Sequence, residues 1–197
     1  MSLTKTVKEK SCKVCKAKFT PYRQIQAWCS PSCAVELARA RVEKAKKTER
    51  LDEARADRKK REAMKTHPQL IKEAQREFNR FVRLRDVGRP CICCGASLDG
   101  NGPGGAADAG HYRSVGSAPN LRFNEDNCHA QAKKCNRYGS GRAVDYRVGL
   151  LVRIGVDRVE ALEADNTPKH YTKDEIRSIR DTYRAKAREL EKSNVHR

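Results

Sequence analysis

The sequence lacks the features of a membrane or secreted protein. No apolar run approaches the roughly 20 residues that a membrane-spanning helix needs. The first residues, Met1 to Lys5, have no apolar core of the kind that a signal peptide carries. We therefore expect a cytoplasmic protein with no membrane partner.

Acidic residues are scarce relative to basic ones. The chain has 25 Asp and Glu against 43 Lys and Arg, which gives a net charge of +18. Such a charge attracts polyanions, and counterions are released when phosphates bind. Nucleic acid is therefore the first partner to consider, although a ribosome-associated or merely basic protein would carry the same charge.

Aromatic residues make up only 6 % of the chain, and hydrophobic residues 38 %, so the apolar core must be small. The nine cysteines fall mostly in tight pairs, and their number is odd. In a reducing compartment this pattern is more typical of metal ligands than of disulfides. We therefore expect bound metal to supply part of the stability.

The first two cysteine pairs lie close to the N-terminus. The pattern is Cys12-x2-Cys15 followed by Cys29-x3-Cys33. Two short turns can each present a pair of thiolates, and a tetrahedral Zn²⁺ joins them. The spacing predicts a zinc ribbon or knuckle over residues 1–33.

Residues 34–88 are expected to form a long basic helix and a second, docking helix. The first is rich in charged residues to about Lys65, and its apolar positions keep no heptad. Pro68 suits the first turn of the second helix, and Gly88 is expected to end it. Its apolar residues recur at helical spacing and can dock on the following domain: Leu70, Ile71, Ala74, Phe78, Phe81 and Val82.

Residues 156–197 are expected to be helical as well. Gly155 suits the end of a helix over 142–154, and Thr172-x2-Glu175 is a capping box that opens the last helix. Since most of the expected elements are helices, the predicted fold class is α+β and mostly helical.

The residues with catalytic chemistry lie in the segment 89–155. Cys91-x2-Cys94 is expected on a β-hairpin knuckle, and the glycine-rich stretch 100–110 lacks the ending of a phosphate-binding loop, so we interpret it as a flexible connection. The remaining residues of interest follow it in the order His111, Asn127, His129, Cys135 and Asn136.

These residue types suit hydrolysis of a phosphodiester beside one cation. A histidine can take a proton from water because its pKa lies near neutrality. An asparagine carbonyl can accept the proton of the other ring nitrogen and fix the tautomer. A divalent cation polarises the phosphate and stabilises the departing oxygen.

The segment resembles an HNH nuclease, which has a ββα-metal fold. The stretches Asp108-Ala-Gly-His-Tyr-Arg113 and Asn127-Cys-His-Ala-Gln131, followed by Cys135-Asn136, are more specifically similar to the phage NinG (Rap) recombination-endonuclease family. The closest match covers about a third of the chain, roughly residues 90–155. The motifs are specific only in combination.

The resemblance implies a structure-selective endonuclease that cleaves branched DNA, such as Holliday junctions and D-loops, in the host cytoplasm. It implies His111 as general base, Asn127 as its orienting residue, and His129 and Asn136 as candidates for a Mg²⁺ or Mn²⁺ site. Asp108 lies two residues before the position where many HNH enzymes place a metal-binding aspartate, so we assign it no ligand role. A homodimer is expected if two opposed strands are cut.

The sequence departs from the family pattern at one position. A cysteine pair is expected before Asn136, but the chain has Ala132-Lys-Lys-Cys135. Only Cys91, Cys94 and Cys135 then remain of four structural zinc ligands. Cys93 or Cys128 could substitute, water could complete the site, or the site could be empty.

A cluster of cations beside the motif suits phosphate contacts: Arg113, Arg122, Lys133, Lys134 and Arg137. The alternative function is a non-catalytic zinc protein that binds DNA or RNA on an HNH-derived scaffold, which Ala132 favours. A third interpretation, an adaptor acting through its helices, explains the charge but not the histidines and asparagines.

Overall fold

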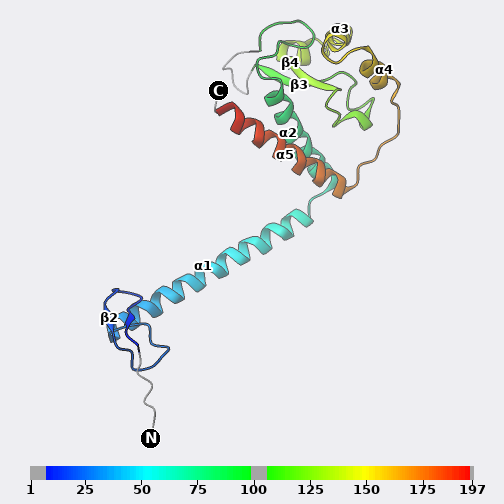
Figure 1. The fold of residues 1–197 in the computed structure, drawn as a ribbon. Helices are drawn as coiled ribbons and strands as arrows, with labels where there is room; N and C mark the ends of the chain where they lie inside the picture. Colours follow the sequence, from blue (N-terminus) through cyan, green and yellow to red (C-terminus); the bar gives the residue numbers. More distant parts are fainter. Residues whose placement is uncertain (1–7, 99–105, 196–197) are drawn as a thin grey trace. The chain divides into compact units, whose positions relative to one another are not determined.

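The computed structural model describes residues 8–98 and 106–195, and it divides the chain into two units, Met1–Met64 and Lys65–Arg197 (Figure 1). The boundary falls between the long helix and the docking helix, which the sequence analysis had placed together in 34–88. The segments 89–155 and 156–197 belong to one unit, because helices from both pack around a common hairpin.

The first unit consists of a small antiparallel hairpin and one long helix. Strands β1 (Lys10–Ser11) and β2 (Lys18–Phe19) pair, and α1 (Pro31–Ala63) follows. The Ser30 side chain caps α1 by accepting a hydrogen bond from the Cys33 amide at 3.3 Å. Cys33 is the one buried residue of α1. This helix is therefore solvated along its length, as its composition predicts.

In the second unit, helices α2 (His67–Arg85) and α5 (Lys173–Val195) lie side by side (Figure 1). The predicted apolar stripe of α2 packs against α5 and the hairpin, with Phe78 edge-on to Tyr183 at 4.7 Å between ring centroids. Proline in the first turn of α2 and the Thr172–Glu175 capping box of α5 confirm the predicted helix starts.

A second antiparallel hairpin carries most of the predicted site. Strands β3 (Ala107–His111) and β4 (Cys128–Ala132) pair with His111 opposite Cys128 and Gly110 opposite His129. Part of the stretch predicted as a flexible connection is thus strand β3, because pairing with β4 orders it, while 99–105 lie outside the described residues. Since neighbouring side chains alternate between the faces of a strand, His111 and His129 lie on opposite faces.

Two short helices cover one face of this hairpin. Helix α3 (Ala143–Ile154) ends at Gly155, which has φ +86°, and α4 (Val156–Ala164) follows. Tyr146 of α3 is fully buried; its hydroxyl donates to the Gly110 carbonyl at 2.7 Å and accepts from the His129 amide at 2.9 Å. The fold is therefore α+β and mostly helical, as predicted. No helix in the described part of the chain is long and apolar enough to span a membrane.

Candidate metal centres and active site

The four N-terminal cysteines, Cys12, Cys15, Cys29 and Cys33, converge on one point. Their sulfur atoms all lie within 4.8 Å of one another. Four thiolates arranged tetrahedrally at about 2.3 Å from Zn²⁺ would be separated by about 3.8 Å. The cluster therefore could hold a metal ion with the geometry that the sequence spacing predicts.

Backbone amides favour the thiolate form in this cluster. Burial alone would raise the pKa of Cys12, but amide N–H groups of Cys15, Val14 and Cys29 point at the sulfur and lower it to about 6. The sharp turn after Cys15 places Lys16 at φ +64°. The turn therefore supplies both the position and the electrostatic environment of the ligand atoms.

The second cluster contains four cysteines as well: Cys91, Cys93, Cys94 and Cys135, with sulfur atoms again within 4.8 Å of one another. Cys93 thus occupies the place left by the missing cysteine at position 132. Cys128, the other possible substitute, is buried at the other end of β4, in the apolar core with Phe78, and faces His111 with 3.7 Å between Sγ and Nδ1. Geometry therefore selects Cys93 as the fourth candidate ligand.

Neighbouring groups hold the thiols of this second cluster. The Ala132 amide donates to Cys91 Sγ at 3.2 Å, and Gln131 Nε2 donates to Cys93 Sγ at 3.3 Å. Burial opposes ionisation of Cys91, yet the amides of Ala132, Cys94 and Cys93 lower its pKa to about 7. Ala132 therefore still supports the cluster through its backbone, although its side chain cannot be a ligand.

His111 lies at the end of β3 with one ring nitrogen fixed. Its Nε2 is 2.9 Å from the Arg122 carbonyl oxygen, and because a carbonyl can only accept, Nε2 carries the hydrogen. The other nitrogen, Nδ1, then bears the lone pair and faces the Cys128 thiol at 3.7 Å. Burial lowers the pKa of His111 below its ordinary value, so the ring is neutral at pH 7. A neutral, oriented imidazole is what a general base requires.

Asn127 fixes the loop between the strands and does not touch the imidazole. Its side chain is fully buried; Nδ2 donates to the carbonyls of Arg113 and Leu121, and Oδ1 accepts from the Arg113 amide at 2.8 Å. The predicted contact to the ring is made instead by the Arg122 carbonyl. Asn127 therefore orients His111 indirectly, through the residue that precedes Arg122.

His129 is engaged on both sides of its ring. Nε2 donates to the Asp126 carbonyl at 3.1 Å, so Nδ1 must accept, and Arg85 Nη2 is its donor at 3.0 Å. Its pKa is lowered, first by burial, so it is neutral although Asp86 lies 3.6 Å from Nδ1. With 3 % of its surface exposed, His129 has no free nitrogen for a metal, and we revise its role to a structural one.

Asn136 instead contacts Asp108, to which the sequence motif assigns no ligand role. Its Nδ2 donates to Asp108 Oδ2 at 3.1 Å, and Arg137 binds both oxygens of the same carboxylate at 2.7 and 2.9 Å. Arg137 is the main cause of the lowered pKa of Asp108. Because Asp108 is three residues from His111 on β3, the two lie on opposite strand faces, separated by about 10 Å along the strand.

The predicted phosphate-binding cations separate into different environments. Arg113 is used internally, because its guanidinium donates to the Leu162, Glu163 and Asp165 carbonyls at the end of α4. Arg137 is paired with Asp108. Lys133 is partly buried, whereas Lys134 is exposed in one turn of π-helix, Lys134–Tyr138.

Arg122 lies beside three cations that are not part of the predicted cluster. It lines a pocket of about 490 Å³ together with Lys72, Arg76 and Arg83 of α2. The signal in the sequence is the spacing of these three residues on one helical face, which the general excess of positive charge obscures.

Comparisons with known proteins agree on one family. The family model described as "Bacteriophage Lambda NinG protein" matches residues 4–194. The chain is 38 % identical to "Protein ninG" of Escherichia phage 933W over 93 % of this chain and 94 % of that protein. It is also 38 % identical to "Protein ninG" of Salmonella phage P22 and of Escherichia phage lambda, in each case over 91 % of both chains. No solved structure is significantly similar. The chain therefore belongs to the NinG family of bacteriophage proteins.

Proposed function

We propose that this protein is a metal-dependent, HNH-type endonuclease that cleaves branched DNA during phage recombination. The observation that carries the proposal is the state of His111: a neutral imidazole with Nε2–H held by the Arg122 carbonyl and a lone pair on Nδ1. In this role Nδ1 takes the proton of the attacking water. Asn127 is a positioning residue, because it fixes the loop from which the carbonyl comes.

The candidate cation ligands are Asp108 and Asn136. Both offer side-chain oxygens, the donor type that Mg²⁺ and Mn²⁺ prefer. Asn136 turns its amide nitrogen to Asp108, which leaves its own oxygen for a ligand, and the lowered pKa of Asp108 keeps the carboxylate ionised. A cation bound there would polarise the scissile phosphate and stabilise the leaving oxygen. It would share Asp108 with Arg137 or displace that arginine.

The positions of His111 and Asp108 suggest how a DNA strand would bind. His111 and Asp108 lie on opposite faces of β3, so a phosphodiester at the edge of the hairpin would have the base on one side and the cation on the other. We assign structural Zn²⁺ to the two cysteine clusters, because four thiolates are a ligand set typical of structural zinc. Cutting opposed strands of a junction would require two copies of the chain.

The test is cleavage by His111→Ala beside a matched control, His170→Ala, whose histidine is exposed. Labelled four-way junction, linear duplex and single strand are incubated with the purified protein and Mg²⁺ or Mn²⁺. We expect the parent and His170→Ala to nick the junction preferentially. His111→Ala should lose about 100-fold or more in rate, because a positioned base contributes that much. It should still bind the junction.

Two results would contradict the proposal. Equal cleavage by His111→Ala and the parent would remove His111 from the mechanism. Binding without cleavage by the parent, with either cation, would favour the alternative function, a non-catalytic zinc protein that binds nucleic acid.

A further inference from the structure

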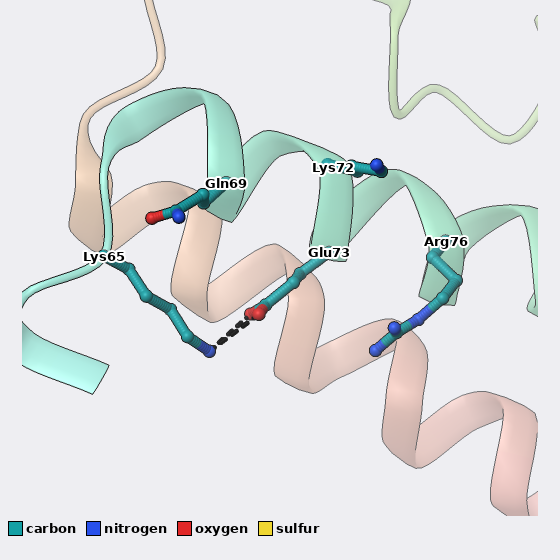
Figure 2. A pocket seen from close by; sticks show the side chains of 5 residues that line it. All are labelled: Lys65, Gln69, Lys72, Glu73 and Arg76. Carbon is teal, nitrogen blue, oxygen red and sulfur yellow. Dashed lines mark hydrogen bonds and ion pairs between the residues drawn. The ribbon is translucent and has the colours of Figure 1, made fainter. Parts of the chain in front are cut away.

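Helix α2 turns its acidic residues and most of its cations to different faces. Its acidic residues Glu73 and Glu77 turn toward α5, where Arg180 lies 3.0 Å from Glu73 and Arg184 lies 3.6 Å from Glu77. Arg76 lies at the boundary, because its guanidinium is also 3.3 Å from Glu77. Glu73 also pairs with Lys65 at 2.7 Å, and Figure 2 shows Glu73 reaching toward Lys65 while the nearby Lys72 extends from another side of the helix. The carboxylates of α2 are thus neutralised within the fold.

The other face of α2 forms a groove without acidic residues. Its lining consists of cations, amides and two apolar residues: Pro68, Ile71, Lys72, Gln75, Arg76, Asn79, Arg83 and Arg122. Lys72, Arg76 and Arg83 are exposed. Along the helix axis, residues 72 and 83 are about 16 Å apart. The groove therefore presents a row of cations long enough to meet several phosphates of one strand.

Part of this groove is already ordered. Arg122 Nη1 donates to Gln75 Oε1 at 3.2 Å, and Gln75 Nε2 donates to Asn79 Oδ1 at 2.8 Å. The backbone of the same Arg122 accepts the hydrogen bond of His111. One residue therefore joins the cationic row to the imidazole.

We infer that this groove binds the sugar-phosphate backbone of a DNA strand and leads it to His111. The inference rests on the proposed function for the identity of the polyanion and the purpose of the path. Side chains that contact phosphates position a strand and carry no sequence preference. Binding through the groove should therefore be insensitive to sequence and strongly dependent on salt.

The experiment compares two triple variants with the same change of charge. The groove variant is Lys72→Gln, Arg76→Gln, Arg83→Gln. The control is Arg89→Gln, Arg188→Gln, Lys192→Gln, which removes three exposed cations elsewhere in the same unit. Binding to a labelled four-way DNA junction is measured by fluorescence anisotropy from low to high salt, without added divalent cation. Thermal unfolding verifies that both variants keep the parent fold.

For the groove variant we expect the slope of log affinity against log salt to fall by about 2 to 3 units, since each lost phosphate contact removes about 0.9. The control should change the slope by less than one unit. Equal losses in both variants would mean that net charge alone drives binding and would overturn the inference. So would an unchanged slope in the groove variant.

The binding measurement is independent of cleavage. A parent that shows groove-dependent binding but never cleaves would overturn the proposed nuclease and leave the groove in place. If the parent cleaves the junction and the groove variant binds it normally, the groove inference is overturned and the proposed nuclease is kept.

Discussion

The two cysteine clusters have the same ligand chemistry but different surroundings. Around the first, only Cys12, Pro21 and Cys33 are buried among the described residues of its unit. The second lies beside β4 and α3, in a unit that has two apolar cores around Phe78 and Tyr146. The comparison indicates that the first cysteine knuckle needs bound metal in order to fold. In the second unit, bound metal would only add to the stability that the apolar cores provide.

The largest effect is expected from Cys12→Ser. Without this ligand the first cluster should lose its metal, and residues 8–30 should unfold because no apolar core remains to hold them. The second unit should be unchanged. Elemental analysis should give about one zinc per chain where the parent gives about two, and NMR should show loss of amide dispersion confined to the first unit. Full zinc content in the variant would contradict this view of the knuckle.

A smaller effect on folding is expected from Cys93→Ser in the second cluster. We expect loss of one zinc per chain, a lower melting temperature of the second unit, and a decrease in its free energy of unfolding on the order of 4 kcal/mol. The cooperative unfolding transition should remain, because the apolar cores are intact. The control is Cys128→Ser, which removes the other possible substitute and should keep both zinc ions.

A rescue experiment combines Cys93→Ser with Ala132→Cys. Residue 132 contacts the cluster through its amide, so a cysteine there should restore four thiolates and the second zinc. Loss of zinc in Cys128→Ser, or retention in Cys93→Ser, would show that the fourth ligand is not Cys93.

Local rules predicted much of this fold. Pro68, the Thr172–Glu175 box and Gly155 mark helix ends through chain geometry alone, and the structure has them there. The first cysteine cluster followed from spacing, because its ligands lie on two tight turns. Such features depend on residues close in sequence, so no tertiary information was needed.

Local rules could not decide between similar residues that lie close together in the sequence. Cys93 and Cys128 are equally good ligands by type, and only the packing of the hairpin places one in the cluster and the other against His111. As residue types, His129 and His111 are equally suited to catalysis. The pairing of β3 with β4 decides between them, since it buries His129 beside Arg85 and Tyr146.

The smallest effect tests how the second cluster is seated on α3. A Cβ at Gly149 would lie 1.8 Å from the Ile92 carbonyl oxygen, between two of the candidate ligands. Glycine to alanine in a helix ordinarily stabilises by about 1 kcal/mol. Here we expect Gly149→Ala to destabilise the second unit by about 1 to 3 kcal/mol in denaturant unfolding, because backbone must move. Gly116→Ala is the control, as its nearest heavy atom is 3.9 Å away. If Gly149→Ala stabilised the unit, α3 would not pack closely against the turn that carries Cys91 and Cys93. The second cysteine cluster would then be as independent of an apolar core as the first.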